Sequence, residues 1–266
     1  MKMNALEKKM LDIACKLRDE FGLVSVKAEF EAEGTRTDEL LRLLEIANKA
    51  NLKIALKIGG CEAIRDLIES KNFGCNYIIA PMIETPYALS KYIEAKERVY
   101  SADGSSDCEF LFNLETISGY ENRMEMVSLA KDKLDGCVFG RVDFVGSLSQ
   151  HRDSINDNGI TDKVCNVAAI CKDKNLDLVV GGGVSMDAIP ALQKINEIHL
   201  SRFETRKLVF AAKSCLIPNM DQALVSAVDF ELTWLKNKRD AYGAIFREDD
   251  RRIKMLETRW LTMVQS

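Results

Sequence analysis

The sequence predicts an α/β fold, a (β/α)8 TIM barrel with a long C-terminal helical extension. Short apolar runs alternate with amphipathic segments along most of the 266 residues, which is typical of parallel strands joined by helical crossovers. Seven such units follow one another, and so many favour a closed barrel over an open sheet. A third pattern, nearly continuous helical periodicity beyond Asn219, predicts the extension.

Three segments follow from these patterns. Residues 1–22 are expected to form an N-terminal amphipathic helix, residues 23–215 the barrel, and residues 216–266 the extension. The first segment scatters its charges among apolar residues, so it lacks the apolar centre of a secretory signal.

Each strand is expected where an apolar run ends in charged, polar or glycine residues. The expected strands cover 24–30, 53–58, 77–83, 109–115, 137–144, 176–180 and 198–203. An eighth strand is not visible. Either the chain around 21–24 supplies it, or the N-terminal helix stands in for a lost first strand.

The helices between these strands begin with residues that favour a helix start. Asp38 and Glu39 would lie in the first turn of a helix at 37–50, where negative charge is favoured. Pro86 suits the first turn of a helix at 86–100, and Ser185 could cap a helix at 185–195. The remaining helices are expected at 62–70, 119–134, 161–173 and 205–213.

The C-terminal extension carries an apolar stripe with helical spacing. The stripe comprises Leu224, Val228, Leu232, Leu235, Tyr242, Ile245, Ile253, Leu256, Trp260 and Met263. An unbroken helix would be about 65 Å long, too long for one barrel, so a break is expected near Gly243. A neighbouring subunit is the simplest partner for the stripe, which predicts a homo-oligomer. Packing on its own barrel is the alternative.

Composition excludes several classes of partner. The chain has 37 basic and 41 acidic residues, a net charge of −4, and no basic tract, so neither nucleic acid nor a membrane surface is an expected partner. The sequence has no run of about 18 apolar residues, so no membrane span is expected. A cytoplasmic location is then expected by default. The eight cysteines form no CxxC pair, and we interpret them as free thiols rather than a zinc site.

Acidic residues at the ends of neighbouring strands indicate a metal site. Barrel enzymes carry their active residues at the carboxyl ends of the strands, where Glu115 and Asp143 follow the fourth and fifth apolar runs. Two hard oxygen ligands facing one cavity suit Mg²⁺ or Mn²⁺. The alternative is that an arginine or lysine pairs with each carboxylate.

Three motifs resemble the HpcH/HpaI aldolase and citrate lyase family. They are Ala80-Pro81-Met82-Ile83-Glu84-Thr85, Asn113-Leu114-Glu115-Thr116 and Phe139-Gly140-Arg141-Val142-Asp143-Phe144. The resemblance covers roughly residues 24–212, and the spacing of Glu115 and Asp143 is its most specific part. It implies that these two carboxylates hold a divalent metal, which chelates a 2-oxo acid such as pyruvate or oxaloacetate and stabilises its enolate.

The resemblance also points to residues that would bind the acid. Lys57 lies where the family usually has an arginine, and Arg141 would add a second cation; the alternative for Lys57 is an ion pair with Glu29 or Glu84. Ala32 occupies the place of a family histidine used in proton transfer, so Glu29 or Glu31 could act as acid or base. Glu84 is expected to contact the substrate.

A glycine triplet on the sixth strand suggests an anion site. Gly182 and Gly183 lead to Ser185 at an expected helix start, where exposed N–H groups favour phosphate or carboxylate. A tight turn is the alternative. Glu204 could form an ion pair with Arg202 or Arg206, or contact the substrate; His199 is expected to be a satisfied core residue.

The sequence thus predicts a metal-dependent carbon–carbon lyase or aldolase acting on a 2-oxo acid, with a phosphorylated or polyanionic partner substrate as an option. A catalytically reduced barrel that binds partners through its C-terminal helix is one alternative. A phosphosugar isomerase built on the glycine triplet is another. The acceptor and the direction of the reaction do not follow from the sequence.

Overall fold

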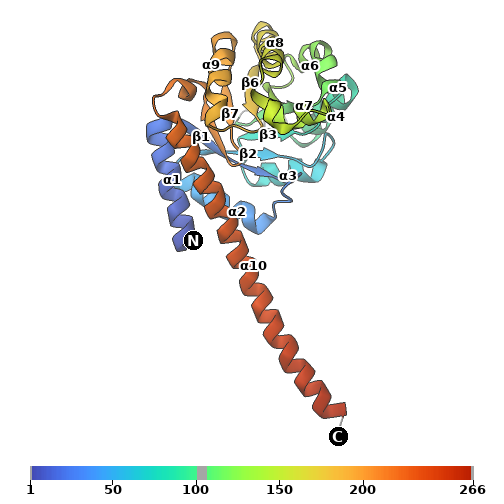
Figure 1. The fold of residues 1–266 in the computed structure, drawn as a ribbon. Coiled ribbons are helices and arrows are strands. Elements are labelled where there is room, and N and C mark those ends of the chain that lie inside the picture. Colours follow the sequence, from blue (N-terminus) through green and yellow to red (C-terminus); the bar gives the residue numbers. More distant parts are fainter. Residues whose placement is uncertain (1, 101–106, 265–266) are drawn as a thin grey trace.

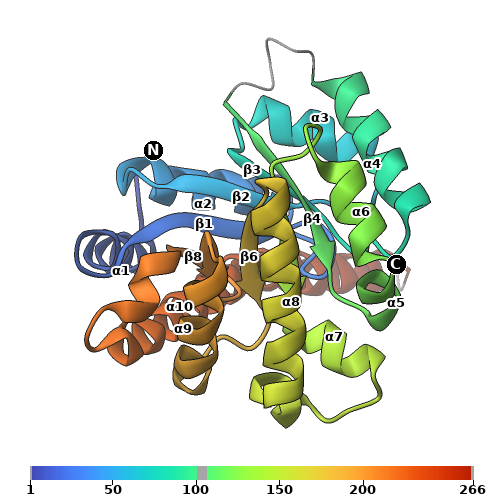
Figure 2. The ribbon, with the colours of Figure 1, turned by 90° about the horizontal axis from the view of Figure 1, so that it is seen from above.

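The computed structural model describes residues 2–100 and 107–264. Eight strands within these residues form a closed barrel in which each strand pairs with the next along the chain (Figures 1 and 2). They are β1 (Leu23–Glu29), β2 (Lys53–Lys57), β3 (Tyr77–Ala80), β4 (Glu109–Leu114), β5 (Gly136–Gly140), β6 (Asp177–Gly181), β7 (Arg202–Glu204) and β8 (Leu208–Ala211). The predicted barrel is therefore confirmed.

The eighth strand is antiparallel to both of its neighbours, while β1 to β7 run parallel. It forms a hairpin with β7, closed by hydrogen bonds between Thr205 and Leu208. The prediction of a helix at 205–213 was wrong, because Leu208–Ala211 is a short apolar strand followed by the 3-10 helix η4 (Ala212–Leu216). The barrel is modified at its last strand, not at its first.

Helices surround the barrel on its outside (Figure 2). They are α1 (Ala5–Phe21), α2 (Thr37–Lys49), α3 (Ile64–Asn72), α4 (Pro86–Val99), α5 (Ile117–Glu121), α6 (Arg123–Ala130), α7 (Arg141–Ser147), α8 (Asn158–Lys174) and α9 (Ile189–Ile198). The 3-10 helices η2 (Arg152–Asn156) and η3 (Met186–Ala188) precede α8 and α9. Asn4 and Glu7 cap α1 reciprocally, while Met1, which the predicted first helix included, lies outside the described residues.

Two predicted boundaries at the barrel mouth are wrong. The fifth strand ends at Gly140, so Arg141 and Asp143 lie in the first turn of α7 and not on a strand. The helix expected from Ser185 starts at Ile189, and the Ser185 side chain makes no capping hydrogen bond. In both places the apolar pattern continues across a change of element, so periodicity alone does not locate the boundary.

The C-terminal helix α10 (Met220–Val264) is 45 residues long and unbroken. The expected break near Gly243 is wrong, because one glycine costs a helix only about 1 kcal/mol and introduces no obligatory kink. One face of the first half packs beside α1 and the barrel, burying Phe230 and Trp234, and the second half projects away from the barrel (Figure 1). Of the described helices, none has the length and apolar character needed to cross a membrane.

Side chains in the barrel interior form three layers. The middle layer is apolar and comprises Ala55, Ile79, Leu111, Val138, Val179 and Val209. At the amino ends of the strands, Arg202 pairs with Glu109 and Asp177 at 2.9 Å each. The ion pair considered between Arg202 and Glu204 is therefore not formed, because the two side chains lie at opposite ends of the barrel interior. The third layer is charged and lies at the carboxyl ends.

Candidate active site

A cavity of about 600 Å³ occupies the barrel mouth at the carboxyl ends of the strands. The charged residues that line it are Lys27, Glu29, Glu31, Lys57, Glu115, Asp143, Arg152, Glu204, Arg206 and Glu231. Most come from strand ends and the loops after them, as barrel enzymes place their active residues. Glu231 belongs to α10, so the C-terminal helix forms part of the wall.

Glu115 is held rigidly at the end of β4. Its carboxylate is buried; Oε1 accepts a hydrogen bond from the Met82 backbone at 3.0 Å, and Oε2 accepts one from Asn113 Nδ2 at 2.6 Å. Met82 has a φ of 51°, a conformation that is strained for a side chain of this size. A Cβ on Gly140 would lie 2.6 Å from Glu115 Oε2, so glycine there leaves space for the carboxylate.

Asp143 lines the same cavity from the first turn of α7, where it is exposed. The structure thus brings Glu115 and Asp143 to one cavity, from β4 and α7. Asn113 adds a buried Oδ1 that has no hydrogen-bond partner among the described residues. These oxygens are the donors that Mg²⁺ and Mn²⁺ prefer.

No group of three or more His, Cys, Asp or Glu residues suited to a metal was found within residues 2–100 and 107–264. A magnesium site needs no such cage, because this ion usually takes one or two carboxylates and fills its other positions with water or substrate oxygens. The pair Glu115 and Asp143 therefore fits such an ion in the type and number of its donors.

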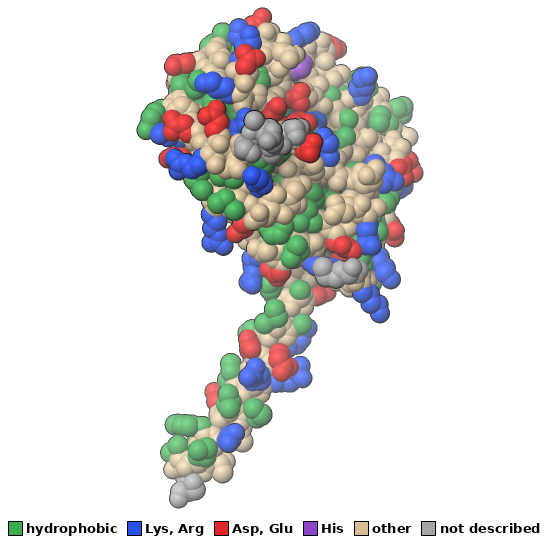
Figure 3. Space-filling model, turned by 180° about the vertical axis from the view of Figure 1, so that it is seen from behind, with side chains coloured by type: hydrophobic (Ala, Val, Ile, Leu, Met, Phe, Trp, Pro, Cys, Tyr) green, Lys and Arg blue, Asp and Glu red, His purple; other side chains and the backbone are tan. Residues whose placement is uncertain are grey.

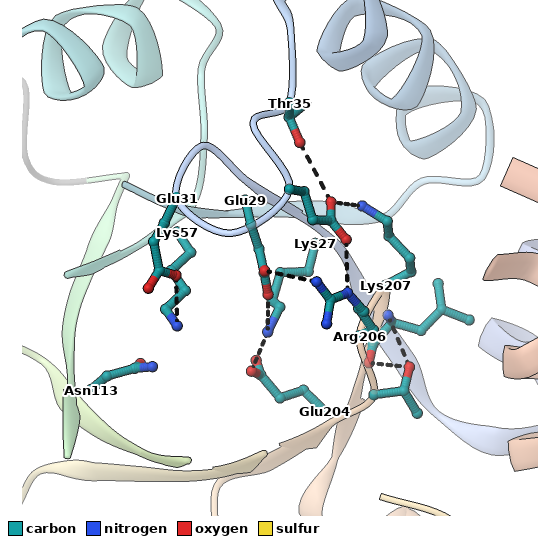
Figure 4. Close-up of polar contacts among 12 residues, drawn as sticks. Lys27, Glu29, Glu31, Thr35, Lys57, Asn113, Glu204, Arg206 and Lys207 are labelled. Atoms are coloured by element: carbon teal, nitrogen blue, oxygen red, sulfur yellow. Dashed lines mark hydrogen bonds and ion pairs between the residues drawn. The ribbon is translucent and has the colours of Figure 1, made fainter. Parts of the chain in front are cut away.

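Lys57 lies between two carboxylates. Its Nζ is 2.9 Å from Glu31 Oε2 and 3.4 Å from Glu115 Oε1; Figure 4 shows Lys57 next to Glu31 and Asn113. Burial alone would lower the pKa of Lys57, but Glu115 and Glu31 outweigh burial and raise it. Lys57 therefore remains a cation in the cavity wall. The pairing considered with Glu29 or Glu84 is not observed.

A second set of ion pairs extends from β1 to β7 across the mouth (Figure 4). Lys27 Nζ lies 2.5 Å from Glu204 Oε1 and 3.2 Å from Glu29 Oε1, and Arg206 lies 3.9 Å from Glu29. Burial would raise the pKa of Glu29, but Lys27, Lys57 and Arg206 together lower it. Glu29 is therefore held ionised and is a weak proton acceptor near neutral pH.

Sequence reasoning missed Lys27, which is buried in the barrel interior. Its signal was present: Lys27 is two residues before Glu29, and alternate strand residues share a face. Gly181 leaves space for the Glu204 carboxylate, as Gly140 does for Glu115, because a Cβ at Gly181 would lie 2.9 Å from Glu204 Oε1.

The cavity wall carries an excess of negative charge. Its described lining contains six carboxylates and four cationic side chains. The carboxylates therefore outnumber the cationic side chains by two, and a buried carboxylate without a cationic partner is costly. A divalent cation would balance this excess.

Several predicted site residues lie elsewhere. Glu84 and Ser185 are not among the cavity-lining residues, whereas Gly182 and Gly183 are. Gly182 has a φ of 79°, and a Cβ there would lie 2.7 Å from the Arg141 backbone nitrogen. The triplet therefore forms a tight turn against α7, and the helix that follows begins only at Ile189.

Arg141 is also outside the cavity lining. Its buried guanidinium donates to the Gly181 carbonyl at 3.3 Å and to Asn156 Oδ1 at 2.9 Å, and burial lowers its pKa to about 10. Nη2 has no partner within the described chain. Arg141 was expected at a strand end that faces the cavity, but α7 begins at this residue, which directs its side chain under the turn at Gly181.

The two histidines differ: His151 is exposed and lies 3.0 Å from Asp153, whereas His199 Nε2 lies 2.8 Å from the Leu176 carbonyl oxygen. His199 therefore has the expected polar partner, but it is half-buried at the end of α9 and not a core residue. Ala32 lines the cavity, so alanine is present where the resemblance placed the family histidine. All eight cysteines are free, in agreement with the sequence interpretation.

Solved structures share this barrel. The fold is that of the HpcH/HpaI aldolases. One such aldolase, from Desulfitobacterium hafniense, matches with a TM-score of 0.61 at 9% identity, over 76% of this chain and 83% of that one. A HpcH/HpaI aldolase/citrate lyase family protein from Burkholderia cenocepacia matches with a TM-score of 0.57 at 14% identity, over 85% of this chain and 99% of that one.

A variant of the citrate synthase SbnG matches with a TM-score of 0.56 at 14% identity, over 83% of this chain and 89% of that one. At these identities the likeness is one of fold. No family model and no curated protein matches the sequence. The family resemblance predicted from the motifs is confirmed at the level of the fold.

Proposed function

We propose that this chain is a divalent-metal-dependent carbon–carbon lyase or aldolase that acts on a 2-oxo acid of the pyruvate or oxaloacetate type. The observation that carries the proposal is the presence of Glu115 and Asp143 in one cavity with an excess of carboxylates. In this proposal the barrel, residues 23–215, is the catalytic unit, and residues 216–266 serve oligomerisation.

Glu115 and Asp143 would hold Mg²⁺ or Mn²⁺. The bound ion would supply Lewis acidity to the keto and carboxylate oxygens of the substrate. The Met82 N–H and Asn113 Nδ2 fix the Glu115 carboxylate in one orientation, which reduces the reorganisation needed when a ligand binds.

Lys57 would bind the substrate carboxylate. Its ammonium is charged and lies 3.4 Å from Glu115, so an acid bound next to Glu115 would be within its reach. Lysine offers a point charge without the two-pronged geometry of arginine. Arg206 and Arg152 also line the cavity, and they would bind further anionic groups, including those of a phosphorylated or polyanionic partner substrate.

Proton transfer falls to Glu31 and not to Glu29. Glu29 is held ionised by three cations, whereas Glu31 lies at the cavity wall with Lys57 as its ion-pair partner. Release of Lys57 to an incoming acid would free the Glu31 carboxylate. Glu31, and not the predicted Glu29, is therefore the proposed acid or base.

The test compares two variants that each remove one cavity acid. Mn²⁺ binding is measured by electron paramagnetic resonance for the wild type, Glu115→Gln and Glu231→Gln, together with decarboxylation of oxaloacetate. We expect Glu115→Gln to lose at least tenfold in Mn²⁺ affinity, while Glu231→Gln, which removes the same charge from the α10 wall, stays near the wild type. Equal binding by Glu115→Gln and the wild type would contradict the proposal.

A second candidate is a binding or scaffold protein. The exposed apolar residues of the projecting half of α10 favour it, and Figure 3 shows hydrophobic side chains along that part of the helix. Wild-type protein that binds neither Mn²⁺ nor pyruvate would support this candidate. The other alternative, a phosphosugar isomerase, depended on a helix that starts at Ser185 directly after the glycine triplet. The first α-helix after Gly183 starts at Ile189, so this alternative is not supported.

A further inference from the structure

The projecting half of α10 exposes large apolar side chains to solvent. Phe246 is 71% exposed, Trp260 62% and Met263 67%. A solvated helix of this length gains nothing from such residues, and contiguous exposed apolar surface marks an interaction site. The spacing of the residues identifies what covers it.

Twelve positions of α10 repeat with alternating steps of three and four residues. They are Val225, Val228, Leu232, Leu235, Arg239, Tyr242, Phe246, Asp249, Ile253, Leu256, Trp260 and Met263. We call this set the α10 seam. Ten of its members are apolar, and a repeat averaging 3.5 residues is the signature of a left-handed coiled coil.

The seam remains available along the half of α10 that touches the barrel. Val225, Val228, Leu232 and Leu235 are 46–65% exposed, whereas Phe230 and Trp234 on the other face are buried. Tyr242 belongs to the seam, and its hydroxyl also donates a hydrogen bond to Glu39 of its own barrel. A second helix can therefore lie along the seam without displacing the barrel contacts.

The two charged members determine the direction of pairing. Arg239 and Asp249 lie at equal distances on either side of Ala244. In an antiparallel pair centred on Ala244, each Arg239 faces Asp249 of the other copy. A parallel pair in register would place arginine against arginine and aspartate against aspartate, which is destabilising.

The same centre matches every apolar position with another apolar position. Across the pair, the facing side chains are Val225 with Met263, Val228 with Trp260, Leu232 with Leu256, Leu235 with Ile253, and Tyr242 with Phe246. We propose that two copies of this chain associate through an antiparallel coiled coil of their α10 helices, centred on Ala244. The interface is isologous, as a closed dimer requires.

This pairing brings the second copy to the catalytic cavity. Val228 and Glu231 line the cavity, and Trp260 of the second copy would face Val228. Arg259 would meet Glu231 at the flanking position, where opposite charges add specificity. The rim of each cavity is then completed by the α10 end of the other copy.

Two flanking pairs carry like charges, Lys238 with Arg252 and Asp229 with Glu257. They do not oppose the pairing strongly, because Lys238 and Asp229 already form ion pairs with Glu39 and Lys9 of their own subunit.

Sedimentation equilibrium of the full chain tests the proposal with charge exchange. We expect a wild-type dimer, at least tenfold weaker association for Arg239→Asp or Asp249→Arg, and recovery in the double variant, which restores opposite charges only in the antiparallel pair. Both side chains are exposed, so circular dichroism should show unchanged folding.

A second readout is the fluorescence of Trp260, taken as the difference between the wild type and Trp260→Phe. Its emission should shift to longer wavelength on dilution, as the indole leaves the interface. A wild type that stays monomeric at all concentrations would overturn the proposal, and so would a dimer that is insensitive to both single charge changes.

Discussion

At the scale of single residues, glycines give the site its shape. Gly140 and Gly181 face Glu115 and Glu204 so closely that a Cβ at either position would overlap the carboxylate or its side chain. Glycine at these strand ends therefore makes space for buried acids, which sequence patterns record only as strand terminators. The positions of Glu115 and Lys57 could be predicted from strand ends, but the space that accommodates them could not.

Gly140→Ala should displace the Glu115 carboxylate. We expect destabilisation of about 1–3 kcal/mol from overpacking and at least a tenfold loss of Mn²⁺ affinity, measured by urea unfolding and Mn²⁺ titration. The matched control is Gly146→Ala in α7, where a Cβ meets nothing within 4 Å and alanine should stabilise the helix slightly. If Gly140→Ala bound Mn²⁺ as tightly as this control, Glu115 would not be a ligand.

Lys27 should contribute strongly to stability, because it neutralises Glu29 and Glu204 in the barrel interior. Lys27→Met leaves both carboxylates without this partner, and we expect a loss of about 3–5 kcal/mol in the free energy of unfolding at pH 7. Lys9→Met removes an exposed pair with Asp229 and should cost less than about 1 kcal/mol. Similar costs for the two variants would contradict the assigned role of Lys27.

Acid should remove the contribution of Glu29. Its pKa in the folded protein is lowered from the ordinary value of 4.5, so the stabilisation is complete above that pH and is lost as the pH falls below it. Urea unfolding between pH 7 and pH 3 should show a smaller decline for Glu29→Gln than for the wild type. Parallel declines for the two proteins would show that the Glu29 pairs do not stabilise the folded state.

At the scale of elements, the pattern of apolar runs located seven strands, and the eighth was missed for a physical reason. β8 has only four residues and follows β7 through a tight turn, so its apolar residues continue what resembles a helical period. Charged pairs were missed similarly: Lys27 meets Glu204 because β1 and β7 approach each other across the barrel interior, and no local spacing encodes that approach. The acids themselves were found because strand ends are a local feature.

For α10, the length and periodicity of the helix could be predicted from the sequence, but its course could not. A break was expected because the whole helix was assumed to pack on a single barrel. A helix that continues into solvent satisfies the same pattern if its second half pairs with another molecule. The predicted stripe also mixed two faces: Leu224 is buried against the barrel, whereas Val228 and Trp260 are exposed.

At the scale of the whole molecule, the barrel and the projecting helix should be separable. A chain ending at Gly243 keeps the barrel and the α10 residues that pack on it. We expect its melting temperature to lie within a few degrees of that of Arg239→Asp, measured at a concentration at which that variant is monomeric. We also expect the dimer to be lost in sedimentation. A truncated chain that still dimerised would place the interface elsewhere.

The central claim is that Glu115 and Asp143 bind one divalent cation at the barrel mouth. The most direct measurement is anomalous diffraction from a crystal grown with Mn²⁺ and pyruvate. The account predicts a single manganese peak about 2.1 Å from a carboxylate oxygen of each residue, with the pyruvate carboxylate near Lys57. Glu115 still paired with Lys57 in that crystal, with no manganese between Glu115 and Asp143, would contradict it.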